Sequence, residues 1–162
     1  MSAQGMRVIG VDPGLGITGF GIIEQQGQQL QSICYGTVRP PTKFSLPLRL
    51  KYLFDEIMQL CQEYRPDILS IEDTFYQKNV KAALSLGQAR GTVLLAGAIY
   101  GIPCKEYSPR KVKNSVTGNG AATKEQVQFM VQRILNLPEK PTPLDASDAL
   151  AIALCYLNQP EW

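Results

Sequence analysis

The sequence predicts an α/β protein in which helices flank a mixed five-stranded sheet. Three β-branched, apolar segments separated by short turns come first, and they are typical of an antiparallel meander. Segments of helical period then alternate with two short strands, which indicates strand–helix–strand crossovers and parallel pairs. The chain has 162 residues, of which 44% are hydrophobic and 19% charged, and no linker divides it. We therefore expect a single domain over residues 1–162, with the five residues before Met6 as extra sequence.

The strands of the meander are expected at residues 6–12 (MRVIGVD), 17–24 (ITGFGIIE) and 29–38 (QLQSICYGTV). Residues 13–16 (PGLG) supply the proline and glycines of a tight turn between the first two. The apolar residues then recur at helical spacing, so an amphipathic helix is predicted at residues 46–64. It ends before Pro66, because proline cannot continue a helix.

Two short strands and four helices are predicted in the rest of the chain. Ser108 suits an N-cap and Pro109 suits the first helical turn, so a short helix begins there. Thr123 and Gln126 match a capping box, which predicts the start of the following helix. In order, the segments are a strand at 67–72, a helix at 78–100, a strand at 103–107, and helices at 109–117, 124–135 and 144–158.

The composition excludes several classes of site. There is no histidine, so the chain has no Ser–His or Cys–His nucleophilic pair and no imidazole metal ligand. The four cysteines are far apart among apolar residues, and we expect buried free thiols in a reducing cytoplasm. The N-terminal segment has no secretory signal. The longest apolar stretch, residues 93–102, is too short to span a membrane, and we expect no membrane association.

Four carboxylates lie where they can do chemistry. Asp12 ends the first strand, Glu72 ends the fourth, and Asp145 and Asp148 share a face of the last helix. Because strand ends in such sheets gather at one edge, Asp12 and Glu72 are expected to be neighbours. Converging carboxylates repel each other unless a cation neutralises them, and hard divalent cations prefer oxygen ligands. Two such ions about 3.5–4 Å apart promote phosphodiester hydrolysis.

Each of these acids also has a simpler interpretation. Asp12 before Pro-Gly suits a turn, and the acids of the last helix suit its positive N-terminal end. Two features favour a catalytic or metal-binding role instead. Asp148 lies in an otherwise apolar stretch and Glu72 directly continues an apolar strand, so each needs a partner or a metal ion. Asp73 is expected to be a loop acid or a supporting one.

The net charge of +2 hides a strong segregation of charge. Residues 74–124 hold eight basic residues and one acid, a net charge of +7, which leaves −5 for the rest of the chain. Such a segment suits contact with nucleic-acid phosphates, although a solvated surface would also explain it. Two aromatics in it would either stack on unpaired bases or belong to the core. The candidate DNA contacts are Phe75, Tyr76, Lys78, Lys81, Arg110, Lys111, Lys113 and Lys124.

Four segments together resemble the RuvC family of Holliday-junction resolvases. They are IGVDPGLGITGFGII, SIEDTFYQKNVKAALSLGQARG, SPRKVKNSVTGNGAATKEQV and LDASDALAIALCY, in the order and spacing of the family, and they cover nearly the whole chain. The resemblance implies a ribonuclease-H-like fold, a homodimer, and paired nicks at four-way junction DNA in recombination and repair, with Mg²⁺ or Mn²⁺ as cofactor. It also implies work beside the RuvA–RuvB branch-migration complex.

The resemblance also implies roles for single residues. Phe75 is similar to the junction-engaging aromatic of the family, and Lys113 and Lys124 are similar to its catalytically important lysines, which contact DNA. Some members carry histidine at the last acidic position, whereas this chain has an aspartate, so its site is all-carboxylate. The implied ligands of two metal ions per active site are Asp12, Glu72, Asp145 and Asp148.

The predicted long helix carries small residues on one stripe. Ala83, Gly87 and Gly91 follow one another at intervals of four residues. Such a stripe permits close approach, either of the sheet beneath the helix or of a second copy of the chain across a dimer interface. The sequence leaves both open.

Three other functions are weighed against a junction resolvase. The DPGLGITG hairpin is also similar to the phosphate-binding hairpin of actin- and hexokinase-like ATPases, but those folds need a second such hairpin, and the sequence contains only one. The chain could be a ribonuclease-H-like nuclease that acts on RNA–DNA hybrids or single strands. It could also be an inactive junction-binding module, although the four intact acids argue against that.

Overall fold

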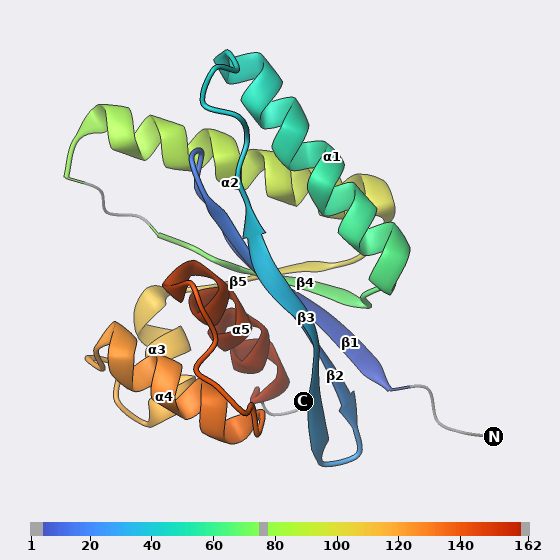
Figure 1. Cartoon of the computed structure of the whole chain (residues 1–162), viewed down its shortest axis with the longest axis vertical. Coiled ribbons are helices and arrows are strands. Elements are labelled where there is room, and N and C mark those ends of the chain that lie inside the picture. Colours follow the sequence, from blue (N-terminus) through green and yellow to red (C-terminus); the bar gives the residue numbers. More distant parts are fainter. Residues whose placement is uncertain (1–4, 75–77, 160–162) are drawn as a thin grey trace.

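The computed structural model describes residues 5–74 and 78–159. Figure 1 shows a central sheet with α1 and α2 on one side and α3, α4 and α5 on the other. The elements in chain order are β1 (Met6–Asp12), β2 (Thr18–Gln26), β3 (Gln29–Val38), α1 (Leu46–Tyr64), β4 (Ile68–Glu72), α2 (Val80–Tyr100), β5 (Cys104–Tyr107), α3 (Pro109–Thr117), α4 (Lys124–Ile134) and α5 (Leu144–Leu157).

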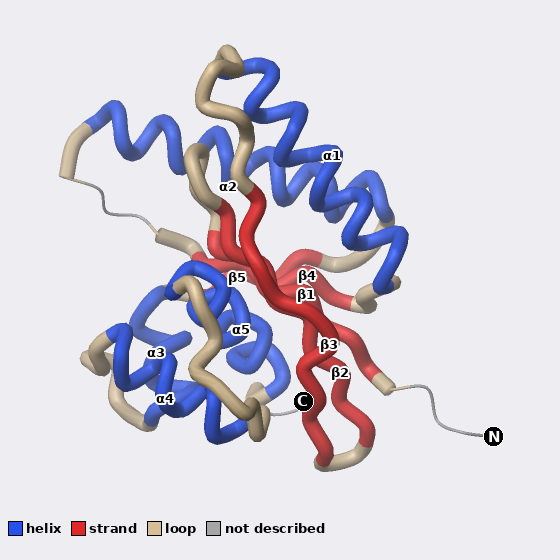
Figure 2. The backbone as a smooth tube through the Cα atoms, viewed as in Figure 1, coloured by secondary structure: helices blue, strands red, loops and turns tan. Residues whose placement is uncertain are grey.

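The five strands form one mixed sheet in the order β3-β2-β1-β4-β5 (Figure 2). The pairs β1–β2 and β2–β3 are antiparallel, as expected for a meander with short turns. The pairs β1–β4 and β4–β5 are parallel, because the connection between the strands of each pair passes through a helix. The predicted mixed five-stranded sheet with flanking helices is therefore confirmed.

The central strands β1, β2 and β4 are buried on both faces of the sheet, and their residues alternate between two cores. Val8 and Ile68 belong to the core shared with α3, α4 and α5. Ile9 and Leu69 belong to the core shared with α1 and α2. Since successive side chains on a strand point to opposite faces, this alternation decides on which face every later residue of β1 and β4 lies.

Helix α5 lies unusually close to the sheet because glycines face it. A β-carbon at Gly10 would lie 2.1 Å from the carbonyl oxygen of Ala149, and one at Gly19 would lie 2.0 Å from that of Asp145. No side chain fits at these two positions without moving the helix. The buried Ser70 hydroxyl also donates a 2.8 Å hydrogen bond to the carbonyl oxygen of Ile152, which fixes α5 against β4.

The helix boundaries follow from local capping. Ser108 and Thr123 cap α3 and α4 as predicted, and Thr123 completes a capping box with Gln126. Helix α2 begins at Val80, two residues later than expected, because the Asn79 side chain accepts a hydrogen bond from the amide of Ala82 and so serves as the N-cap.

Two expectations drawn from composition have different outcomes. All four cysteines are free, as predicted; two are buried and two half-buried. The expectation that no apolar stretch reaches membrane-spanning length is wrong for α2 as a whole, which is long and apolar enough by length and composition. In this fold α2 nevertheless packs on the sheet, where Ala89, Val93 and Ala96 are completely buried.

Candidate active site

The carboxyl ends of β1 and β4 bring two acids side by side. In the parallel pair, Val11 lies opposite Ile71, so Asp12 and Glu72 follow at the same edge of the sheet. Both lie on the α5 face, because they continue the alternation of Val8 and Ile68. The predicted neighbourhood of these two acids is therefore present in the structure.

Helix α5 brings the other two acids toward this edge, at different depths. Asp148 lines the same cavity as Asp12 and Glu72. Asp145 lies one turn earlier and does not line it, although its charge is close enough to raise the pKa of Asp12 and of Asp148. The close contact of α5 with Gly19 occurs at Asp145 itself, so the glycine holds this helix end beside Asp12.

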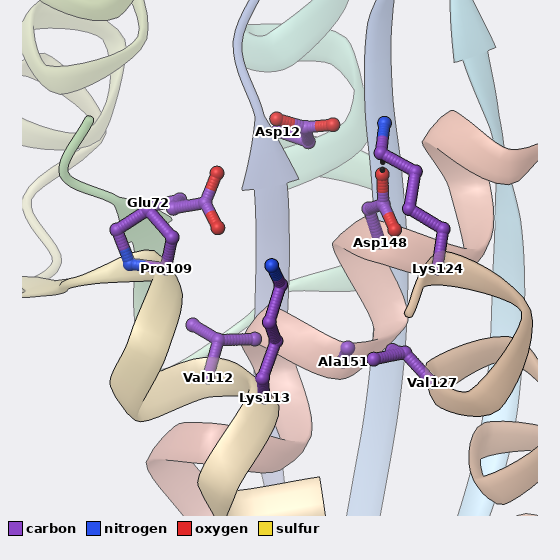
Figure 3. Close-up of a pocket in the computed structure, with 9 residues that line it drawn as sticks. All are labelled: Asp12, Glu72, Pro109, Val112, Lys113, Lys124, Val127, Asp148 and Ala151. Atoms are coloured by element: carbon purple, nitrogen blue, oxygen red, sulfur yellow. Dashed lines mark ion pairs between the residues drawn. The ribbon is translucent and has the colours of Figure 1, made fainter. Parts of the chain in front are cut away.

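Two lysines face the acids from α3 and α4. They line one cavity of about 210 Å³ together with three acids and an apolar floor that includes Val112, Val127 and Ala151. Figure 3 shows Lys113 rising from α3 and Lys124 from α4 toward the carboxylates. The Lys124 Nζ lies 3.7 Å from the Asp148 Oδ2. The site thus contains acids for a cation and cations for a phosphate.

Burial and crowding make these acids hard to ionise. Burial, and then the charges of Glu72, Asp148 and Asp145, raise the pKa of Asp12 to about 8. Burial also raises the pKa of Glu72, against the hydrogen bond from Thr74 and the charges of the two lysines. The pKa of Asp148 is raised chiefly by burial, and Lys124 opposes that shift. Such a cluster is fully ionised at neutral pH only when more positive charge enters it.

The chemistry of the donors fits a hard divalent cation, since carboxylate oxygens are its preferred ligands. The side chains are not closed around one position, however. Within residues 5–74 and 78–159, no three Asp, Glu or Cys side chains are grouped so that they could hold a metal ion. The carboxylates would therefore have to turn toward an ion as it binds.

The other predicted contacts lie outside this cavity. Lys78 precedes α2 and Lys81 lies in its first turn, both exposed. Arg110 and Lys111 are exposed on α3, and the Lys111 Nζ lies 5.4 Å from the centre of the Tyr107 ring. The predicted aromatic contacts Phe75 and Tyr76 fall outside the described residues.

Sequence reasoning missed residues that support the acids rather than join them. The Thr74 hydroxyl donates a 3.3 Å hydrogen bond to the Glu72 Oε2. The Thr18 hydroxyl closes the turn after Asp12 by accepting from the amide of Gly14 and donating to its carbonyl oxygen. The glycines in β1 and β2 could have indicated the close packing of a helix on these strands, because a glycine within a strand often marks a close approach of other backbone.

Comparisons with known proteins agree on one family. A family model described as "Crossover junction endodeoxyribonuclease RuvC" matches residues 8–156. A protein of that name from Syntrophomonas wolfei is 45% identical over 153 residues, which cover 94% of this chain and 89% of the relative. Another from Desulforamulus reducens is 47% identical over 151 residues, with 93% of each chain covered.

A solved structure shows the same likeness in three dimensions. It is described as "T. thermophilus RuvC in complex with Holliday junction substrate" and superposes with a TM-score of 0.89 at 32% identity. The alignment covers 94% of this chain and 93% of that one. The ribonuclease-H-like fold expected from the sequence is confirmed by this match.

Proposed function

The chain belongs to the RuvC family of crossover junction endodeoxyribonucleases, and on this premise we propose how it cuts a four-way DNA junction. Membership makes it a junction-resolving endonuclease that acts in recombination and repair. The observation that carries the proposed mechanism is the meeting of three acids and two lysines in one cavity, with a fourth acid at its border.

The carboxylates are the cation-binding part of the site. Asp12, Glu72, Asp145 and Asp148 would hold the Mg²⁺, or Mn²⁺ in its place, and two ions per site would suit four acids. Bound divalent cations supply the positive charge that activates water and neutralises the scissile phosphate. Asp12 would be the central ligand, because it ends β1 beside the end of β4 that carries Glu72 and lines the same cavity as Glu72 and Asp148.

The lysines are the phosphate-facing part of the site. Lys124 lies at the first turn of α4, and its ion pair with Asp148 directs its ammonium group toward the acids. Lys113 opposes the negative charge of Glu72 and Asp148 from the neighbouring helix. Ammonium groups fixed in this way stabilise the negative charge that builds up on a phosphate during cleavage.

Further contacts would hold the junction around the cavity. Exposed basic residues of α3 lie on one side of the site. Those at the start of α2 follow the strand end that carries Glu72. Basic side chains in these positions suit the phosphate backbone of two arms, and the aromatics before α2 suit unpaired bases at the crossover. The residues proposed for these contacts are Phe75, Tyr76, Lys78, Lys81, Arg110 and Lys111.

Two opposed nicks require two active sites, and we assign the dimer contact to α2. Among the described residues, no atoms lie within 4 Å of the positions that β-carbons at Gly87 and Gly91 would take, so this face of the helix points away from the sheet that Ala89 and Val93 pack against. The same face exposes large apolar side chains, among them Leu84 at 61% and Leu95 at 54%. An apolar face of this kind suits an isologous contact with a second copy.

The cellular setting follows from the family alone. We propose that the enzyme works in the cytoplasm, beside the RuvA–RuvB branch-migration complex, on junctions that this complex moves.

The choice of substrate tests the proposal. A labelled four-way junction, a linear duplex of the same arms and an RNA–DNA hybrid are incubated with the protein in Mg²⁺ and in EDTA. We expect cleavage of the junction alone, in Mg²⁺ alone, at opposed positions in two strands. Preferential cleavage of the hybrid would favour a ribonuclease, and binding without cleavage in Mg²⁺ or Mn²⁺ would indicate an inactive module.

A further inference from the structure

A second polar cluster lies on the opposite face of the sheet from the acids of the active site. At its centre is Arg90 of α2, whose Nη2 lies 3.2 Å from the Asp73 Oδ1 and also donates a hydrogen bond to the Glu106 Oε1 of β5. The Arg90 and Asp73 side chains are only 24% and 20% exposed. This pair is therefore largely withdrawn from water, where charge-assisted hydrogen bonds are stronger than at the open surface.

The cluster is joined to the active site through the backbone of a single residue. Glu72 is the last residue of β4 and faces the cavity, so Asp73, the next residue, points to the other face, where α2 lies. The Asp73 amide also donates a 2.7 Å hydrogen bond to the carbonyl oxygen of Tyr107, which extends the pairing of β4 with β5 by one residue. Asp73 is thus held at both its backbone and its side chain.

Glu72 lies opposite Tyr107 in the ladder of β4 and β5, and the amide of Asp73 makes the next bond to the same residue, so β5 holds this strand end from one side. Among the described residues, the hydrogen-bond donor to the Glu72 carboxylate is the Thr74 hydroxyl at 3.3 Å, which belongs to the same strand end. Because Thr74 moves with Glu72, it cannot fix the direction in which this strand end points. Arg90 can fix this direction, because it belongs to a separate helix.

We propose that Arg90 is a positioning residue, which fixes the Glu72 strand end through Asp73 and so prepares this carboxylate to hold a metal ion. The inference rests on the proposed role of Glu72 as a metal ligand. Partners hydrogen-bonded directly to a metal ligand typically change metal affinity or activity by about 10–100-fold when they are removed, and Arg90, which acts through the backbone of Asp73, is expected at the lower end of that range. The proposal also makes α2, the helix assigned to the dimer contact, a direct support of the active site.

Metal binding without DNA tests the proposal apart from catalysis. The variants are Asp73→Asn, which keeps the shape of the side chain, and Arg90→Met, which removes the cation. The matched control is Asp55→Asn, which makes the same change of side chain in an exposed ion pair on α1. In that pair the Lys51 Nζ lies 2.6 Å from the Asp55 Oδ2. Glu72→Gln is the reference for loss of the ligand itself.

Mn²⁺ affinity is measured by the electron paramagnetic resonance signal of the free ion. The kcat of nicking is measured at saturating junction in Mn²⁺, junction Kd by gel shift in EDTA, and thermal stability in EDTA. We expect Asp73→Asn and Arg90→Met to lose about 10-fold or more in Mn²⁺ affinity and in kcat. Junction Kd should stay unchanged and Tm should move by no more than about 4 °C. Asp55→Asn should match the wild type in all four measurements.

Two results would overturn the proposal in distinguishable ways. If Glu72→Gln loses Mn²⁺ binding and nicking while Asp73→Asn and Arg90→Met retain both, Arg90 has no positioning role and the metal site stands. If Glu72→Gln itself retains both, the proposed role of Glu72 fails and the inference fails with it. Should Arg90→Met not fold, the near-isosteric Asp73→Asn decides alone.

Discussion

Replacing Asp12 by asparagine separates the charge of this side chain from its shape. Burial and the three neighbouring acids raise the pKa of Asp12 from 3.8 to about 8. Since the folded pKa exceeds the unfolded one, the favourable contribution to folding is full below about pH 4 and is lost as the pH rises through about 8. The metal-free wild type should therefore become less stable over this range, and Asp12→Asn should not share this loss.

The magnitude follows from the size of that pKa difference. About four units at ~1.4 kcal/mol each correspond to roughly 6 kcal/mol. Burying the asparagine amide offsets about 1–3 kcal/mol of this. We therefore expect Asp12→Asn to be about 3–5 kcal/mol more stable than the wild type at pH 8 in EDTA. For a chain of this size, the midpoint of thermal unfolding should be roughly 6–20 °C higher.

Circular dichroism melts at pH 5 and pH 8, in EDTA and in Mg²⁺, provide the measurement. The advantage of Asp12→Asn should shrink at pH 5, and Mg²⁺ should raise the midpoint of the wild type while leaving that of the variant nearly unchanged. Nicking should fall by about 100-fold or more, because a lost cation removes several kcal/mol of charge stabilisation. A variant that is less stable than the wild type at pH 8 in EDTA would refute the reasoning, since Asp12 would then not lie in a crowded, buried acidic cluster.

The other predictions concern the helix contact, the lysines and the dimer face. Gly19→Ala should cost about 3 kcal/mol of unfolding free energy in urea, because its β-carbon would lie 2.0 Å from the Asp145 carbonyl oxygen, whereas Gly16→Ala meets nothing within 4 Å and should be neutral. Lys124→Met should lower the kcat of nicking by about 100-fold without abolishing junction binding, and the exposed Lys43→Met should change neither; equal rates for the two variants would remove Lys124 from the mechanism. Leu95→Glu should yield monomers in sedimentation and single instead of paired nicks, while Leu48→Glu, similarly exposed on α1 at 50%, should remain dimeric. Persistence of the dimer in Leu95→Glu would place the contact elsewhere.

Local patterns predicted most of the fold because the relevant forces are local. The bounds of α1 and α3 agree with the sequence prediction, since proline, the Ser108 cap of α3 and helical spacing act within a few residues. The neighbourhood of Asp12 and Glu72 was also predictable. It needs only two parallel strands that end at the same edge, and the order of elements already implies them.

Contacts between distant elements could not be predicted in the same way. Asp145 and Asp148 are three residues apart, but the angle at which α5 crosses the sheet decides that only Asp148 lines the cavity. That angle depends on Gly10 of β1 and Gly19 of β2, which lie at the other end of the chain from this helix. The pairing of Arg90 with Asp73 likewise depends on how α2 lies across β4, which no local pattern encodes. For the stripe of small residues on α2, the sequence left open whether it packs on the sheet or on a second copy of the chain. The structure shows that Gly87 and Gly91 do not face the sheet.

The most direct test of paired, metal-dependent cleavage uses a supercoiled plasmid that extrudes a cruciform, incubated with the enzyme in Mg²⁺ or in EDTA. Paired nicks in opposed strands within one binding event convert this plasmid to the linear form, whereas independent nicks give relaxed circles. We predict linear product in Mg²⁺ with ends at symmetric positions across the junction, and no product in EDTA. Nicked circles without linear product, or linear product in EDTA, would contradict this prediction.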